Sequence, residues 1–360
     1  MMNVKRIFFL ALLAFVASAI NAQTVYTEAS KLTLVGKIHK DTPNPYHRVD
    51  TVKFKGFSKS ENLQVRMSSG IAVAFKTNST SISVKTIYGT PGWPTNTNGI
   101  SGRGYDLYIK QDGKWVYAAS GVAPDDKLES KLVLIKSMDG NMKECLLYLP
   151  TYSEVNSVQI GIQDDARIEP IENPFRHRVA IFGSSFTHGS STSRAGMSYP
   201  AQFSRKTGIQ LLSLGCSGNC KLQPYFADVL CAADVDAFIF DSFSNPSPKQ
   251  IQERLIPFIE KIQAAHPGKP LIFQKTIRRE SRNFNVQAEK YEQERMDMAD
   301  KMMGYIVKNY KDVYYITPNA SAEDHNASVD GVHPTNYGYT LWVESIEKPV
   351  LKILKSYGIQ

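Results

Sequence analysis

A serine that could act as a nucleophile follows an apolar segment in the second half of the chain. Residues 179–182 form a short apolar run, which ends at Gly183 and continues into Ser184 and Ser185. This pattern predicts a buried parallel strand that delivers a loop. Ligands in open α/β sheets bind where such strands end, and the dipole of a following helix favours negative charge, so Ser185 is the candidate nucleophile. The alternative is that both serines only cap the next helix.

An acid and an imidazole lie together near the end of the chain, at Asp330 and His333. A serine hydroxyl attacks well only when a base removes its proton, and histidine titrates in the range that suits this task. An acidic partner on the other ring nitrogen fixes the tautomer and stabilises the imidazolium. Three residues apart in a glycine-containing loop, Asp330 and His333 could meet directly, although each also fits an ordinary surface or turn position.

Two other predicted strand ends carry donors that acyl transfer needs. The segment 214–219 offers flexible backbone N–H groups around Gly218 and a side-chain amide at Asn219. The segment 241–246 offers the side-chain amide of Asn245. Together with the serine, the acid and the imidazole, these groups would face one rim of a parallel sheet.

Several other residues are candidates for contacting a substrate. His188 lies three residues after Ser185 and is a rival base, but no carboxylate partner is evident, which favours a pocket-lining or structural role. Arg194 and Arg278 lie in or near rim loops and could bind an acidic sugar or carboxylate, although a solvated surface arginine is the commoner outcome. Trp93 belongs to a long glycine- and proline-rich loop over 90–104, and such loops often carry function.

Strands and helices alternate after residue 174, and this alternation predicts a parallel sheet covered on both faces. The expected strands cover 179–182, 210–214, 237–241, 271–275 and 313–316. The expected helices lie near 199–207, 222–233, 248–265, 286–308 and 337–357.

The first half of the chain has an all-β pattern over 24–173, typical of a two-sheet, jelly-roll-like sandwich. Alternating or β-branched runs cover 71–75, 81–86, 105–109, 115–119, 131–135, 144–148 and 158–162. Gly, Asn, Asp and Pro turns separate these runs, and 111–114 is a hairpin signal. We therefore predict a β-sandwich domain over 24–173 and an α/β domain over 174–360.

Residues 1–22 have the composition of a cleavable signal peptide. Lys5 and Arg6 precede an apolar core over 7–16, and small residues follow at suitable cleavage positions. A retained signal anchor is the alternative. No cysteine follows either cleavage position and no later apolar run is long enough for a membrane helix, so we expect export to the periplasm or outside without stable membrane insertion.

Charge and cysteine usage exclude further classes. Removing Lys5 and Arg6 lowers the formal net charge from +8 to +6, and no basic stripe is interleaved with aromatic residues, so nucleic acid is not an expected partner. The spacing of the cysteines indicates neither a zinc site nor any other metal site. We expect mainly buried free thiols, with a strained link between Cys216 and Cys220 as the alternative.

Four ordered blocks resemble the motifs of the SGNH (GDSL-type) hydrolase superfamily. They are Gly183-Ser184-Ser185, Gly218, Asn245 and the final pair Asp330 and His333. Further similarity, over 193–200 and 214–219, is to a subgroup whose N-terminal β-domain carries a Gly-x-Asp-Leu-Tyr motif, here residues 104–108. The sequence departs from the superfamily in having Ser184 for an aspartate, and Ser244-Asn245-Pro246 where Gly-x-Asn-Asp is usual.

The resemblance implies a flavodoxin-like three-layer domain with a triad of Ser185, His333 and Asp330. Its oxyanion hole would combine the backbone N–H groups of Ser185 and Gly218 with the side-chain amide of Asn245, for which Asn219 is the substitute candidate. No metal or organic cofactor is implied. Acyl transfer with such preorganised donors agrees with the chemistry expected from the residues alone.

The sequence therefore predicts an exported serine esterase that removes small acyl groups, most simply acetyl, from an acylated carbohydrate. The carbohydrate preference rests on the resemblance and on export. Two alternatives are a lipid-directed esterase or lysophospholipase, which would need a broad apolar groove, and a carbohydrate-binding protein with a vestigial hydrolase half. The intact Ser185, Asp330 and His333 argue against the last. The loop over 90–104 is expected to shape the substrate pocket.

Overall fold

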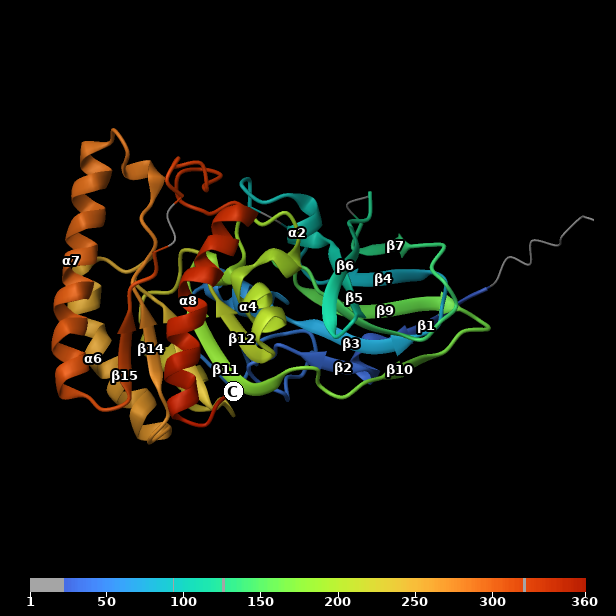
Figure 1. Ribbon diagram of the computed structural model, residues 1–360, viewed down its shortest axis with the longest axis horizontal. Coiled ribbons are helices and arrows are strands. Elements are labelled where there is room, and N and C mark those ends of the chain that lie inside the picture. The colour runs from blue at the N-terminus through green and yellow to red at the C-terminus, as the bar shows by residue number, and fades with distance from the viewer. Residues whose placement is uncertain (1–22, 93, 125–126, 320–321) are drawn as a thin grey trace, which may run out of the picture.

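The computed structural model describes residues 23–92, 94–124, 127–319 and 322–360. The predicted signal peptide and Trp93 thus lie outside the described residues. An antiparallel β-sandwich and an α/β domain lie side by side along the long axis of the molecule (Figure 1). The predicted fold class is confirmed.

Two antiparallel sheets form the N-terminal domain. The first has the order β1-β9-β4-β7, and the second has the order β10-β3-β8-β5-β6 with β2 also paired to β3. The strands are β1 (Thr24–Glu28), β2 (Thr33–Val35), β3 (Ala72–Thr77), β4 (Ile82–Tyr88), β5 (Tyr105–Gln111), β6 (Lys114–Gly121), β7 (Glu129–Ile135), β8 (Lys143–Tyr148), β9 (Val155–Gln163) and β10 (Ile168–Pro170). Alternating residues such as Val73, Leu107 and Ile160 fill the core between the sheets.

Sequence reasoning left several N-terminal elements unpredicted. Helix α1 (Lys59–Arg66) begins at Ser58 in a capping box with Glu61. Helix α2 (Gly99–Arg103) lies inside the segment expected to be an irregular loop, and the Asn98 side chain caps it. The short strands β1, β2 and β10 also lacked a clear sequence signal, because runs of three to five residues at a sheet edge show little alternation.

Five parallel strands form the sheet of the C-terminal domain, in the order β12-β11-β13-β14-β15. The strands are β11 (Arg176–Gly183), β12 (Ile209–Gly215), β13 (Ala237–Asp241), β14 (Leu271–Gln274) and β15 (Val313–Ile316). The helices are α3 (Ser185–His188), α4 (Tyr199–Thr207), α5 (Pro224–Cys231), α6 (Pro248–Ala265), α7 (Val286–Asn309) and α8 (Asn336–Ser356). The strands and long helices match the predicted segments to within a few residues.

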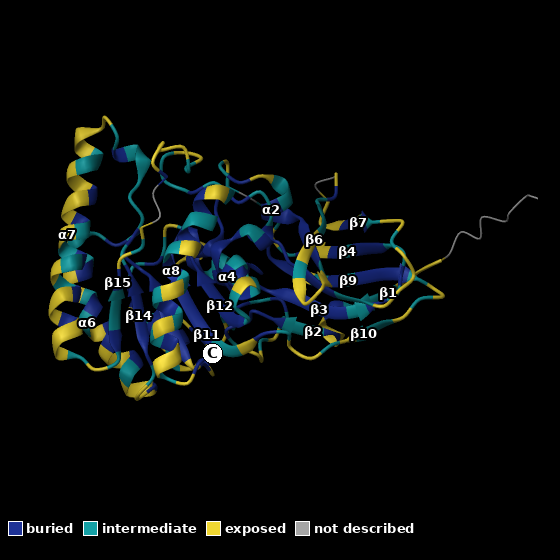
Figure 2. Ribbon diagram, viewed as in Figure 1, coloured by how far each residue is buried: buried dark blue, intermediate teal, exposed yellow. Residues whose placement is uncertain are grey.

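Alternate residues of β11 point to opposite faces of this sheet. Val179 and Ile181 pack in the core beneath α4 and α8, whereas Ala180 and Phe182 pack in the core beneath α5, α6 and α7. Buried strands lie between helices whose outer faces are exposed (Figure 2). Because both faces are covered, a ligand can approach the sheet only at a strand end.

The second sheet of the sandwich buries its outer face against the α/β domain. Tyr108 and Leu146 from this sheet pack with Ala195 and Ala201 from the other domain. The Gly-x-Asp-Leu-Tyr motif lies at this contact: Asp106 is fully buried and accepts hydrogen bonds from Arg194 Nη1 and from Gly196 N, each at 2.8 Å. The motif therefore joins the two domains.

A second polar contact between the domains is made by Arg48, whose side chain is fully buried. Its guanidinium donates to the carbonyl oxygens of Gly215 and Met67, each at 2.9 Å, and also to those of Gln64 and Ser213. Gly215 ends β12, so Arg48 fixes α1 to the strand end that leads toward Gly218.

All four cysteines are free thiols, three of them buried, which confirms the expectation; Cys216 and Cys220 are not linked. Among the residues that the structure describes, no helix is both long and apolar enough to cross a bilayer.

Candidate active site

Ser185, His333 and Asp330 form a continuous hydrogen-bonded chain. Ser185 Oγ lies 2.8 Å from His333 Nε2, and His333 Nδ1 lies 2.8 Å from Asp330 Oδ2. Because an ionised carboxylate only accepts, Nδ1 carries the proton and Nε2 is left as the acceptor for the serine hydroxyl. This is the tautomer that a general base needs.

The loop that carries Asp330 and His333 is ordered by its own backbone. Asp330 Oδ1 accepts from the N–H groups of Val332 at 3.0 Å and His333 at 2.8 Å, and the His333 carbonyl accepts from Val329 N at 2.8 Å. Partial burial works against ionisation of Asp330, but hydrogen bonds from Asn96, His333 and Val332 outweigh it and hold its pKa well below the usual range. The acid therefore stays ionised beside the imidazole.

Asn96, a residue of the β-sandwich domain, completes this cluster. Its Nδ2 donates to Asp330 Oδ2 at 2.8 Å and lies 3.0 Å from His333 Nδ1. Sequence reasoning pointed to the 90–104 loop but not to this residue. Two asparagines, Asn96 and Asn98, lie in the loop, and neither has a local signal that marks a contact with residues more than two hundred positions away.

Replacing Asn96 with alanine should reduce kcat about 10- to 100-fold and leave KM nearly unchanged. The change removes a hydrogen bond to a charged group, which contributes on the order of 1.5–3 kcal/mol, from the acid that orients the base. Steady-state kinetics on a short-chain ester would measure this. Thr95→Ala, an exposed position next to Asn96, is the control. An unchanged kcat for Asn96→Ala would show that the remaining donors hold Asp330 in place.

Ser185, the candidate nucleophile, lies at the start of α3, directly after β11. Ser184 Oγ caps α3 by accepting from Phe186 N at 3.2 Å, and it donates to Asp241 Oδ2 at 2.8 Å. A side chain at Gly183 would bring its Cβ within 2.0 Å of Thr187 Oγ1, so the turn requires glycine. Ser185 is 5% exposed. Ser184 therefore caps α3, and Ser185 follows it at the rim of the sheet.

Asp241, at the end of β13, is a fully buried carboxyl beneath the nucleophile turn. Besides Ser184, Thr187 Oγ1 donates to its Oδ2 at 3.1 Å. Burial raises the pKa of Asp241 to about 6, although these hydrogen bonds oppose the shift.

The free energy of unfolding of Asp241→Asn, relative to the unmodified protein, should increase as pH rises from about 4 to about 6. An unfolded aspartate releases its proton near pH 4, whereas folded Asp241 keeps its proton to about pH 6. The free energy of unfolding of the unmodified protein therefore falls between these pH values, by up to about 3 kcal/mol, and Asp241 adds little further pH dependence above them. Urea unfolding at a series of pH values would measure the difference. Asp112→Asn, in an exposed hairpin turn, is the control. Parallel pH curves for Asp241→Asn and the unmodified protein would contradict the prediction.

The predicted oxyanion donors lie on the loops that follow β11, β12 and β13. Asn245 Oδ1 accepts a hydrogen bond from Cys220 N at 3.3 Å, which fixes the amide so that Nδ2 remains as its donor group. Asn219 Nδ2 instead donates to Ser217 O at 3.0 Å and to Ser60 Oγ at 3.2 Å. Among the described residues, none accepts a hydrogen bond from Ser185 N, Gly218 N or Asn245 Nδ2. These three donors are free for a ligand, which favours Asn245 over Asn219.

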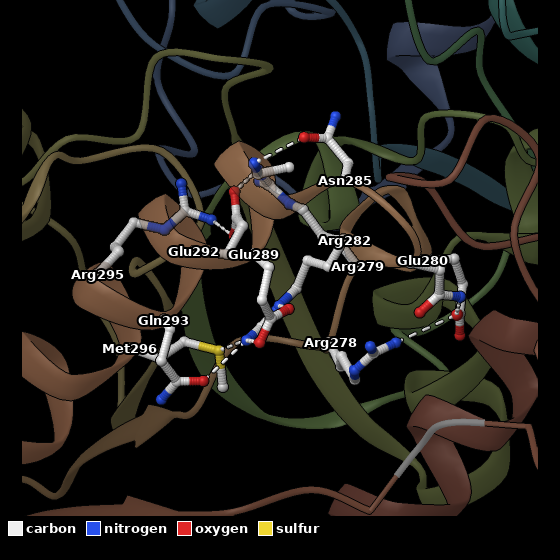
Figure 3. Close-up of polar contacts among 12 residues, drawn as sticks. Arg278, Arg279, Glu280, Arg282, Asn285, Glu289, Glu292, Gln293, Arg295 and Met296 are labelled. Atoms are coloured by element: carbon white, nitrogen blue, oxygen red, sulfur yellow. Dashed lines mark hydrogen bonds and ion pairs between the residues drawn. The ribbon is translucent and has the colours of Figure 1, made fainter.

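An ionic cluster joins the segment after β14 to α7 (Figure 3), and this segment contacts both the Asn245 loop and the loop of Asp330 and His333. Arg279 donates to Ser244 O at 2.7 Å and pairs with Glu292 on α7 at 3.0 Å, and Arg295 pairs with the same carboxylate. In the same segment, Ser281 N donates to Gly331 O at 2.8 Å. Arg278, considered for acid binding, pairs with Glu280 at 3.3 Å. The segment after β14 therefore stabilises two loops at the rim, the one that carries Asn245 and the one that carries Asp330 and His333.

Two expected substrate contacts are corrected by the structure. His188 is fully buried, donates from Nε2 to the Thr151 carbonyl oxygen at 2.8 Å and stacks on Tyr152, so a ligand cannot reach it without opening the interior. Arg194 is held by Asp106 and lies 4.3 Å over the ring of Tyr117, so its charge joins the domains. Their sequence positions near the nucleophile did not show that these side chains turn inward.

Comparison with known proteins assigns the family. Residues 24–168 match the profile for the N-terminus of SGNH hydrolase-type esterases, and residues 176–352 match that of the GDSL-like lipase/acylhydrolase family. The chain belongs to this family of esterases and acylhydrolases, which confirms the resemblance noted above. A comparison with curated proteins found no match.

Solved structures share the two-domain architecture. A candidate GDSL-like lipase of Bacteroides ovatus is 37% identical, with a TM-score of 0.88 over 92% of this chain and 98% of that one. The salicylyl-acyltransferase SsfX3 of a tetracycline biosynthetic pathway is 18% identical, with a TM-score of 0.68 over the same shares. A family two carbohydrate esterase of Cellvibrio japonicus is 10% identical, with a TM-score of 0.59, again over 92% and 98%. The last two share the fold alone.

Proposed function

We propose that this protein is an exported serine esterase that hydrolyses small acyl esters, above all acetyl esters, on carbohydrate. The observation that carries the proposal is the chain of 2.8 Å contacts from Ser185 through His333 to Asp330. Family membership supports ester chemistry. The fold shared with a carbohydrate esterase and the composition of residues 1–22 support the substrate and export.

The reaction follows from the geometry. As Ser185 Oγ attacks the ester carbonyl, its proton passes to His333 Nε2, and the carbonyl oxygen becomes an oxyanion held by Ser185 N, Gly218 N and Asn245 Nδ2. When the carbon–oxygen bond to the sugar breaks, His333 returns the proton to the departing sugar oxygen. Water then loses a proton to His333 as it attacks the acyl carbon. The bond from this carbon to Ser185 Oγ breaks, and His333 returns the proton to Oγ, so the acid leaves and Ser185 is restored.

The test measures acid release from an acetylated plant polysaccharide, p-nitrophenyl acetate, p-nitrophenyl octanoate and a lysophospholipid, with Ser185→Ala as the background. We expect faster release from the two acetyl esters than from the octanoate and the lysophospholipid. Faster octanoate or lysophospholipid cleavage would support the lipid-directed alternative. Binding of the polysaccharide without release from any ester would support a vestigial hydrolase. Sequencing the amino terminus of exported protein checks cleavage near residue 22.

A further inference from the structure

A hollow of about 340 Å³ opens between the two domains. Helix α1 contributes Leu63 and Gln64, the β-sandwich domain also contributes Pro94, and the α/β domain contributes Ser217. Pro94 comes two residues before Asn96, which bonds to Asp330, and Ser217 directly precedes Gly218. Lining residues of the hollow are thus one or two positions in sequence from Asn96, which bonds to Asp330, and from Gly218, a predicted oxyanion donor.

The walls of this hollow are fixed to each other. Tyr152 OH donates to Ser217 Oγ at 3.1 Å, and Gln64 Nε2 donates to Ser217 O at 3.0 Å. Arg48 holds the C-terminal end of α1 and the end of β12 through one guanidinium. The volume is within the range of small-molecule pockets, which are usually preformed. The hollow is therefore a built feature of the domain interface.

The lining combines apolar surface with neutral polar groups. Leu63, Met67, Pro91 and Pro94 give carbon surface, whereas hydroxyl and amide groups come from residues such as Gln64 and Tyr152. No aspartate, glutamate, lysine, arginine or histidine is among the described lining residues. A charged ligand would find no counter-ion there, whereas a neutral sugar ring offers both C–H surface and hydroxyls.

We propose that this hollow is the subsite for the alcohol half of the substrate and that it binds the neutral pyranose ring bearing the ester. The inference rests on the proposed function and deepens it. An acetyl group alone is far smaller than the hollow, so the larger, hydroxyl-bearing half of the ester is the better match. The interface between the domains then selects the substrate, and the α/β domain supplies the chemistry.

Filling the hollow tests this. We expect Leu63→Trp to lower kcat/KM for acetylated methyl xyloside at least tenfold, mainly through KM, while kcat/KM for ethyl acetate, whose alcohol has no ring, stays within about twofold. Ser60→Trp, at an exposed lining position, is a second filling variant if Leu63→Trp folds poorly. Lys59→Trp, exposed on the same helix but outside the lining, is the control.

A second measurement addresses charge: the unmodified protein should prefer acetylated methyl glucoside to acetylated methyl glucuronoside by about tenfold. Equal losses on both esters in the filled variants, no loss on either, or a loss confined to p-nitrophenyl octanoate would overturn the subsite. Failure of the unmodified protein to cleave any acetylated sugar, while it cleaves ethyl acetate, would instead refute the proposed carbohydrate substrate.

Discussion

Replacing Ser185 with alanine is expected to lower kcat/KM for ester hydrolysis by about 10⁴-fold or more. The change removes the only atom placed at 2.8 Å from the base Nε2 of His333 among the described residues, so no covalent acyl intermediate can form. The residual rate should come from the oxyanion donors alone. Acid release by purified protein, with folding checked by circular dichroism, would measure the loss.

The double variant Ser185→Ala, His333→Ala is expected to lose no more than a few-fold beyond Ser185→Ala alone, because the two side chains act as one unit. His325→Ala is the control, since His325 is exposed and pairs with Glu280. Full activity in Ser185→Ala would require another nucleophile. Losses that multiply in the double variant would show that His333 acts independently of the serine.

Replacing Arg48 with methionine is expected to lower the free energy of unfolding by about 3–5 kcal/mol. Methionine fills similar volume but donates nothing, so the carbonyl oxygens of Gln64, Met67 and Gly215 lose their shared donor in the interior. Arg48→Lys should recover only part of the loss, because one ammonium cannot span carbonyls on both sides of the guanidinium.

Urea unfolding would measure both Arg48 variants. Lys53→Met, an exposed cation a few residues away, should change stability by less than about 0.5 kcal/mol. A loss below about 1 kcal/mol in Arg48→Met would contradict the prediction and indicate that the carbonyl groups find water or new partners.

The α/β half was the more predictable part of the fold. Residues 179–182 are all apolar because helices cover both faces of the sheet, so side chains on either face are buried. Gly183 marks the end of this strand because a Cβ there would collide with Thr187. The candidate residues at the rim could be predicted because the carboxyl ends of parallel strands lie at the same edge of a sheet. Ser185, Asp330 and His333 could be proposed together because their ordered motifs resemble those of the SGNH superfamily, whereas each residue alone also fits an ordinary cap, turn or surface position.

The contacts between the domains could not be predicted in the same way. Asn96 and Arg48 owe their roles to partners far away in sequence, and local spacing carries no information on such partners. His188 and Arg194 illustrate the converse, since residues close to the nucleophile in sequence turned into the interior.

The buried outer face of the second sheet also affects whether the two domains can be separated during evolution. Tyr108 and Leu146 face Ala195 and Ala201, and Asn96 reaches across to Asp330. A gene fusion that carried residues 174–360 to a new partner would expose this apolar face and remove a hydrogen-bond donor from Asp330. We therefore expect the two domains to be retained together in related proteins rather than recombined with other domains. New substrate specificities should then arise by substitutions in α1 and in the 90–104 segment.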